Sequence, residues 1–395
     1  MRKPRSASIV GAGCLLFVAV WLLALETEDI LLIKGAKLYT LGPEGVLQDA
    51  GLLIQGGKIK RIFRKDDKPA LPSEGKGMVI DYSGKSIIPG MVDAHTYLSG
   101  YYRLLENTEP ITSDLAAYAV FDALNTEVQE ALRSGITTVN FSPRNENLVA
   151  GISSVMKLPQ SQADILILKK EAFLKISFNA SVVRPDRAPT SLMGAQEMLS
   201  ETMRAVRGNR QGAREGIFGQ KAILRLLDGN LPPMIAASTF AEINTALKWL
   251  ETWKLKGVIV GGEEAHLLSR ALKEREIPVL LSPFLPASPE KMAANAALLA
   301  KQGIAIAFVS HMPEGEPLWL RLSALMLYHQ NISQEEALKT ITLNPARILG
   351  VADSVGSIEV GKDADLVVFL GEPLDLRSKI EAVYINGRNV FEKGN

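Results

Sequence analysis

Three side chains that can transfer protons or bind a metal follow apolar, strand-like segments of the chain. His95 and Tyr97 stand two residues apart in GMVDAHTYLSG (90–100), and His311 directly follows GIAIAFVS (303–310). Imidazole titrates near neutral pH and is a common zinc ligand, so these residues suit either acid–base chemistry or a metal site. The phenol of Tyr97 has a reference pKa of about 10 and is a poor ligand unless it is ionised.

Strand-like and helical segments alternate from about residue 89 onward. The apolar strands expected there are GITTVNF (135–141), PPMIAAS (232–238), KGVIVGG (256–262), IPVLLSPF (277–284) and GIAIAFVS (303–310). The segments between them have apolar residues every three or four positions, which is typical of helices. This alternation predicts a parallel barrel or a doubly wound sheet. In a closed barrel the first and last strands are neighbours, which would place His95, Tyr97 and His311 in one cluster.

Both ends of the chain have a different character, with short strands broken by glycine. Gly56 and Gly57 indicate a tight hairpin turn in the first of these regions. We therefore predict a small composite β-sandwich built from residues 29–88 and 353–395. A TIM (β/α)8 barrel at 89–352 would be inserted between its two halves.

Residues 1–28 differ from the rest of the chain. The basic MRKPR precedes residues 6–25, which carry no charge and are long enough to span a membrane. The flanks fit a signal-peptide cleavage site poorly, so an uncleaved anchor is favoured over a removed signal peptide. The basic N-terminus should stay in the cytoplasm, and the folded part is predicted to lie outside it, in the periplasm or at the cell surface.

Composition restricts the partners. Lys plus Arg number 44 and Asp plus Glu 43, a balance that gives no reason to expect nucleic acid. The single cysteine, Cys14, lies in the apolar N-terminal run, so the folded part can form neither a disulfide nor a zinc–thiolate site. The partners expected are a small-molecule ligand and, through the N-terminal helix, a membrane. Homo-oligomerisation is left open.

Three motifs resemble the amidohydrolase superfamily, nearest its imidazolonepropionase-like branch: SIIPGMVDAHTYLSG, ALKTITLNPARILG and VGSIEVGKDADLVVF. The resemblance extends from about residue 29 to 395. It implies a TIM barrel with a composite sandwich and hydrolysis of C–N bonds in amides. It also implies one or two divalent metals, which would activate water and polarise the carbonyl. Their ligands would be a His pair after strand 1, a His after each of strands 5 and 6, and a catalytic Asp after strand 8.

The chain departs from this ligand pattern. Only His95 matches, as a metal ligand, while Tyr97 replaces the second His of the pair. The ends of strands 5 and 6, MIAAS and VIVGG, have no His, although His266 follows a turn later. Ser310 and His311 replace the Asp. Because a catalytic metal needs about three protein ligands, we expect no cofactor, with a single zinc ion as the alternative.

Five other residues are weaker candidates. Arg144 could meet an anionic ligand, Glu263 follows strand 6 at a helix start, and Ser310 could bond the histidines. We expect Asp93 to fix the turn after strand 1 through side-chain hydrogen bonds. Lys175 stands where some relatives carry a carboxylated lysine, but its context differs, and a solvated amine is expected.

Two functions follow from these residues. The favoured one is a pseudoenzyme of hydrolase lineage that binds a ligand or partner without catalysis. The alternative is an active C–N hydrolase with a rebuilt site, in which His95 acts with Tyr97 and His311 as catalytic groups.

Overall fold

The computed structural model describes residues 30–392 apart from five internal gaps. The gaps are 68–76, 160, 162–164, 215–218 and 285–288. The predicted N-terminal anchor therefore lies outside the described residues. Within the described part, no helix has both the length and the apolar character that crossing a membrane requires.

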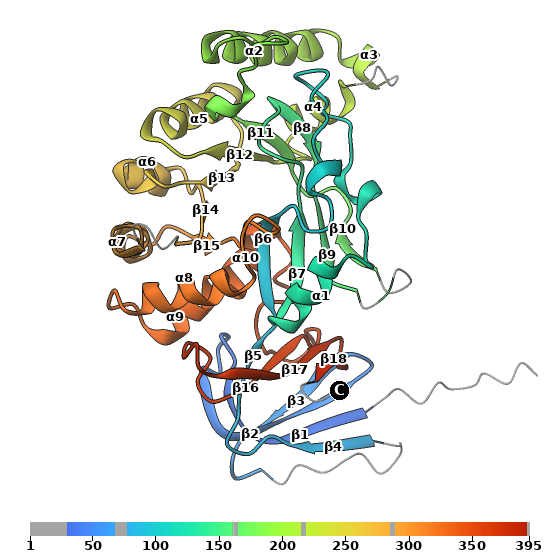
Figure 1. Cartoon of the computed structure of the whole chain (residues 1–395), viewed down its shortest axis with the longest axis vertical. Coiled ribbons are helices and arrows are strands. Elements are labelled where there is room, and N and C mark those ends of the chain that lie inside the picture. Colours follow the sequence, from blue (N-terminus) through green and yellow to red (C-terminus); the bar gives the residue numbers. More distant parts are fainter. Residues whose placement is uncertain are drawn as a thin grey trace, which may run out of the picture.

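A separate β domain occupies the lower part of the molecule in Figure 1 and is one eight-stranded sheet. The sheet has the order β18-β17-β16-β5-β1-β2-β3, and β4 pairs with β1. The strands are β1 (Ile30–Tyr39), β2 (Val46–Gln55), β3 (Lys58–Phe63), β4 (Gly77–Asp81), β5 (Ser86–Pro89), β16 (Leu366–Leu370), β17 (Lys379–Ile385) and β18 (Arg388–Glu392). Both ends of the chain thus contribute strands to the same sheet.

Strands from both ends of the chain belong to one sheet, and its arrangement as a sandwich stays a prediction. Apolar residues from both chain ends share one buried cluster, for example Leu52 and Val368. The N–H of Ala364 donates to the carbonyl of Gly57 over 2.9 Å, which joins the β2–β3 turn to the segment before β16. Gly57 has φ +73°, a conformation that glycine adopts without steric cost.

The second part is a barrel-type α/β domain whose strands form two sheets. These have the orders β10-β9-β7-β6 and β15-β14-β13-β12-β11-β8. The strands are β6 (Met91–Thr96), β7 (Ile136–Phe141), β8 (Val149–Ile152), β9 (Ser154–Lys157), β10 (Leu166–Lys169), β11 (Leu174–Ser177), β12 (Pro233–Ala237), β13 (Val258–Gly261), β14 (Val279–Leu281) and β15 (Ile306–Phe308). Only Ser153 separates β8 from β9, so the two sheets adjoin there.

The strands depart from the closed parallel barrel that we predicted. β9 is antiparallel to β7 and β8 is antiparallel to β11, so the sheets are mixed. No strand pairing joins β15 to β6 among the described residues. Instead, the segment before α10 (Leu343–Leu349) bridges the two strands. The Phe308 N–H of β15 donates to the carbonyl of Thr340, and the Val92 N–H of β6 donates to the carbonyl of Ile341. The fold is therefore of TIM-barrel type but without a closed ring of strand pairs.

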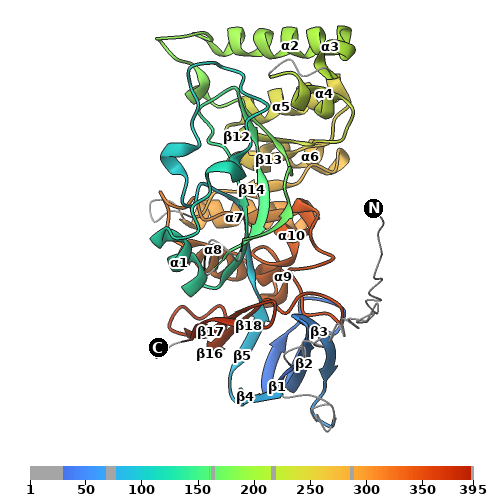
Figure 2. The same cartoon turned by 90° about the vertical axis from the view of Figure 1, so that its right-hand side faces the viewer.

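Helices cover the outside of the barrel strands. Figure 1 shows α5 to α8 beside β12 to β15, and Figure 2 shows α2 to α4 at the end of the molecule farthest from the β domain. The helices are α1 (Thr126–Arg133), α2 (Leu192–Gly208), α3 (Arg210–Arg214), α4 (Lys221–Leu227), α5 (Phe240–Trp253), α6 (Ser269–Glu274), α7 (Pro289–Lys301), α8 (Leu318–Tyr328), α9 (Gln334–Lys339) and α10 (Leu343–Leu349).

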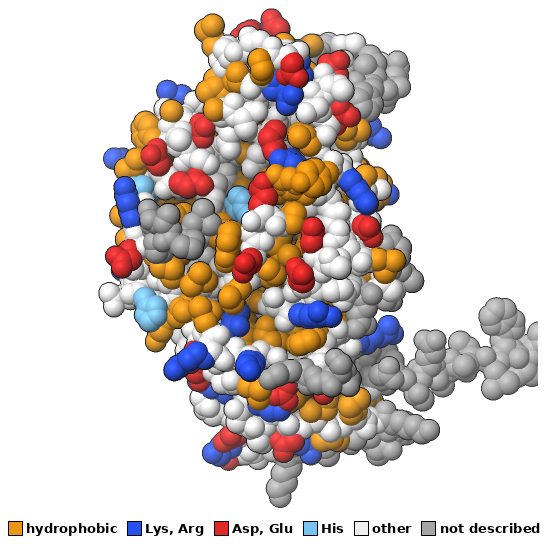
Figure 3. Space-filling view, in the orientation of Figure 1, with side chains coloured by type: hydrophobic (Ala, Val, Ile, Leu, Met, Phe, Trp, Pro, Cys, Tyr) orange, Lys and Arg blue, Asp and Glu red, His pale blue; other side chains and the backbone are white. Residues whose placement is uncertain are grey.

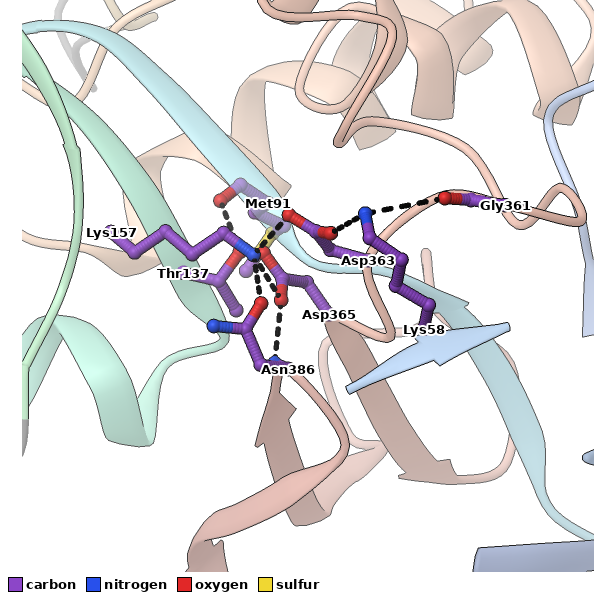
Figure 4. Close-up of polar contacts among 8 residues, drawn as sticks. All are labelled: Lys58, Met91, Thr137, Lys157, Gly361, Asp363, Asp365 and Asn386. Carbon is purple, nitrogen blue, oxygen red and sulfur yellow. Dashed lines mark hydrogen bonds and ion pairs between the residues drawn. The ribbon is translucent and has the colours of Figure 1, made fainter. Parts of the chain in front are cut away.

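A buried ionic network joins the two parts (Figure 4). Lys157, at the end of β9, is 1% exposed, and its Nζ lies 2.8 Å from a carboxylate oxygen of Asp363 and 2.8 Å from one of Asp365. The same amine donates to the side-chain carbonyl of Asn386 over 2.5 Å. Because the carboxylates belong to the C-terminal part of the chain, this lysine ties the barrel to the β domain.

Candidate functional site at the ends of the barrel strands

A lysine–histidine pair lies inside the barrel, between β6 and β11. The Nζ of Lys175 is 2.9 Å from the Nε2 of His95, and both side chains are fully buried. β11 is an interior strand in which all four residues are buried between β8 and β12. The expectation of a solvated Lys175 amine is therefore wrong, since this strand has no solvent-facing side.

Burial determines the protonation of this pair. Loss of solvation lowers the pKa of Lys175 from 10.5 to about 7. The pKa of His95 falls well below its usual value, first because of burial and then because of the Lys175 and His311 charges. His95 is thus a neutral imidazole at neutral pH, and its Nε2 can accept a hydrogen bond from the lysine amine.

Tyr97 and His311 lie beside His95. The ring centroids of His95 and Tyr97 are 5.1 Å apart in an edge-to-face arrangement, and those of His95 and His311 are 6.5 Å apart. The structure thus brings together the three residues that the barrel prediction placed in one cluster. Burial raises the pKa of the Tyr97 phenol above its usual range, so it stays protonated and is a poor metal ligand.

Two imidazole nitrogens of the cluster lack hydrogen-bond partners among the described residues. They are Nδ1 of His95 and Nε2 of His311, and both atoms are buried. Buried polar atoms without partners are uncommon and often mark functional sites. Both nitrogens are therefore available to a small polar molecule that enters the cluster.

Asp93 and Ser310 form a second polar pair beneath the histidines. The Ser310 hydroxyl donates to the Asp93 carboxylate in a short hydrogen bond, and the backbone N–H groups of Ser310 and His95 each donate to it over 3.3 Å. Burial raises the pKa of Asp93 to about 6. Asp93 has the expected turn geometry, whereas Ser310 bonds this carboxylate and not the histidines.

Two further sequence candidates have side-chain partners of their own, although the charge of Arg144 acts on Tyr97 and that of Glu263 on His311. The Arg144 guanidinium lies 3.7 Å from the Tyr101 ring centroid and is paired with Glu146. Glu263 is exposed after β13 and accepts a hydrogen bond from Ser282 over 2.7 Å. A shared ligand pocket of Arg144, Ser310 and Glu263 stays a prediction. His266 lies in a short 3-10 helix after β13, Ala265–Leu268.

Sequence reasoning missed a cavity of about 590 Å³ at the barrel mouth. It lies between the loop after β6, the start of α1 and the loop after β15. Its lining includes Ser99, Tyr101, Tyr102, Arg103, Glu127 and Glu314. Figure 3 shows acidic and apolar side chains interspersed over the middle of one face of the molecule. The adjacent tyrosines after strand 1 were the only sequence signal for this cavity.

The described residues do not fit a metal centre of the kind that the resemblance implies. They contain no group of three or more His, Cys, Asp or Glu side chains placed to hold a metal ion. The Nε2 of His95, the one matched ligand, lies against the lysine amine instead. We therefore assign no chemical step to a metal.

Comparison with known proteins identifies the lineage. Residues 238–390 match the family model described as the amidohydrolase family. Imidazolonepropionase from Rhizobium meliloti is 25% identical over 88% of this chain and 92% of its own length, and the enzyme from Thermoplasma acidophilum is 24% identical over 87% of each. The chain belongs to the amidohydrolase superfamily. Within this superfamily it lies in the imidazolonepropionase-like branch.

A solved amidohydrolase structure supports the same conclusion for the fold. The Thermotoga maritima amidohydrolase superposes with a TM-score of 0.83 and is 28% identical, covering 92% of this chain and all of that one. The amidohydrolase fold therefore extends over nearly the whole chain, including the β domain that both ends build. The matched family region begins just after β12 and includes the ends of β13 and β15.

Proposed function

We propose that this amidohydrolase relative binds a small molecule at its barrel mouth and does not hydrolyse amides by the metal-dependent route. The contact between Lys175 and His95 carries the proposal. Metal-dependent hydrolysis needs an ion that lowers the pKa of a bound water and polarises the carbonyl. Here the Nε2 of the matched ligand is engaged by an amine 2.9 Å away.

The surroundings of the pair support the same proposal. An amine that can become an ammonium group repels a divalent cation placed next to it. Tyr97 and Ser310, which replace two family ligands, offer a protonated phenol and a hydroxyl already bonded to Asp93. Neither group donates a lone pair to a divalent ion as well as the imidazole or carboxylate that it replaces.

A second function is favoured by one observation, the two unpartnered imidazole nitrogens. In this alternative, His95 and His311 would transfer protons in a metal-free hydrolase, with Tyr97 as a donor. Burial lowers the pKa of both imidazoles, so each is neutral at neutral pH and can accept a proton. This alternative requires water and substrate to reach the buried cluster.

Elemental analysis and an amidase assay on the purified full chain test the proposal. We expect well under one equivalent of zinc, iron or manganese per chain, and no hydrolysis of cyclic or linear amides above background. His95→Ala should leave both readouts unchanged, and His329→Gln on the distant end of α8 is the matched control. One equivalent of metal that disappears in His95→Ala, together with hydrolysis, would overturn the proposal. Metal-free hydrolysis lost in His95→Ala and His311→Ala would establish the alternative.

We also propose that the domain lies outside the cytoplasm, held at the membrane by its N-terminal segment. The support is the basic MRKPR before 20 uncharged residues. Protease added to cells with a permeabilised outer envelope should digest the domain. Complete protection there, with digestion after cell lysis, would reverse this orientation.

A further inference from the structure

A row of aromatic rings in edge-to-face contact leads from the buried cluster to the cavity at the barrel mouth. From His95 the rings follow in edge-to-face contacts, with centroid distances of 5.1 Å to Tyr97, 6.1 Å from Tyr97 to Tyr101, and 5.1 Å from Tyr101 to Tyr102. The rings of His95 and Tyr97 are buried, whereas Tyr102 is 91% exposed. The last two rings line the cavity at right angles to each other.

Charges of both signs face this cavity. Arg103 provides a cation, and its only described ion pair is a loose one, 3.7 Å to Asp122. Glu127 and Glu314 provide two carboxylates. Each is held at the wall, because the Ser99 N–H donates to Glu127 over 2.7 Å and the Tyr101 hydroxyl donates to Glu314.

The loop that carries the tyrosines is fixed by packing. A Cβ at Gly100 would lie 2.6 Å from the Phe141 ring and 2.9 Å from Leu104, so only glycine lets the loop pass this close. Ser99 has φ +63°, a conformation that non-glycine residues adopt rarely and that clusters at functional sites. The backbone that carries Tyr101 and Tyr102 is therefore held in place before any ligand binds.

We infer that this cavity binds a zwitterion of the amino-acid type, with an ammonium group, a carboxylate and an apolar side chain. The ammonium group would lie between Glu314 and Glu127, and the carboxylate would bond Arg103. Tyr101 and Tyr102 offer ring faces to the apolar group and to the cation. A phosphate or sulfate ligand fits poorly, since two carboxylates would repel it. This inference rests on the proposed function and specifies which class of small molecule binds at the barrel mouth.

Calorimetric titration of the purified full chain with three matched compounds tests the inference. L-leucine carries both charged groups, isopentylamine lacks the carboxylate, and 4-methylpentanoate lacks the ammonium. Leucine should bind at millimolar or lower concentration, and each of the other two should bind at least about tenfold more weakly. Glu314→Gln should weaken leucine and isopentylamine alike, whereas Arg103→Gln should weaken leucine and 4-methylpentanoate. Arg377→Gln, on the surface of the β domain, is the matched control.

Absence of leucine binding by folded protein at millimolar concentration, or equal binding of all three compounds, would overturn the inference. Thermal melting of each variant shows whether it is folded, and Glu127→Gln is the second variant if Glu314→Gln does not fold. The metal and amidase measurements are independent of this titration. A metal-free, inactive chain that ignores leucine therefore contradicts the ligand class alone.

Discussion

Two lysines are buried on strands of the same barrel, and their surroundings differ. Lys157 closes β9 next to the β domain, where its amine contacts the carboxylates of Asp363 and Asp365. Lys175 lies on β11, where its amine contacts only the imidazole of His95 among the described residues. Burying a charge is costly unless it is paired, so the first lysine is compensated and the second is not. The difference separates a structural joint from a site that can respond to pH or to a ligand.

The largest effect is expected from removing the compensated charge. Lys157→Met leaves the buried Asp365 carboxylate without its cation and removes one of the two cations of Asp363, so it should lower the free energy of unfolding by about 3–5 kcal/mol. Chemical denaturation measures the loss. The matched control is Lys58→Met, which removes the exposed partner of Asp363 and should cost less than about 1 kcal/mol. Equal losses in both variants would show that the network at Lys157 is not the joint described above.

The second prediction concerns the pH dependence of stability. Because the folded pKa of Lys175 is about 7, below its reference value of 10.5, the unfolded chain binds more protons between these pH values. The contribution of this group therefore makes unfolding harder as pH rises, by about 2 kcal/mol from pH 7 to pH 9. Lys175→Met should remove this slope and should be more stable than the wild type at pH 7. Denaturation curves at several pH values measure the free energy of unfolding of both proteins. The same pH dependence in Lys175→Met and in the wild type would contradict the low pKa of Lys175.

A smaller effect is expected at the third buried charge, Asp93. Its carboxylate accepts from the Ser310 hydroxyl, and its pKa is raised to about 6 by burial. Ser310→Ala should destabilise the fold by about 1–2 kcal/mol above pH 6, where the carboxylate is ionised. The cost should decrease below pH 6, where the carboxyl is protonated. Ser354→Ala, in the segment after α10, is the control. A cost independent of pH would mean that the hydroxyl does not stabilise the ionised form.

Much of the architecture was predictable because the spacing of apolar residues and the positions of the motifs indicate the helices and strands directly. Apolar segments separated by helical patterns mark β12 to β15, and glycine-broken strands at both ends mark the β domain. The neighbourhood of His95 and His311 followed from the circular order of strands. The antiparallel β8 and β9 were not predicted, because strand direction depends on tertiary pairing, which sequence spacing does not encode.

The central feature of the site could not be predicted for a related reason. FLKISF is compatible with a strand whose lysine faces either solvent or the interior, because side chains alternate along a strand. A charged residue there favours the solvent face on average. Only the contact of its amine with His95, 80 positions earlier in the chain, shows that Lys175 points into the barrel. The cavity at the mouth likewise depends on two loops and the start of α1, and no local sequence pattern shows that these segments meet.

The most direct test of the account is a crystal structure of the protein grown with excess zinc, with anomalous data collected at the zinc absorption edge. We predict no anomalous peak within ligand distance of the His95 Nε2, and density for the Lys175 amine in hydrogen-bond contact with that nitrogen. A zinc peak at His95, with Lys175 turned away from it, would contradict the central claim that an amine replaces the metal.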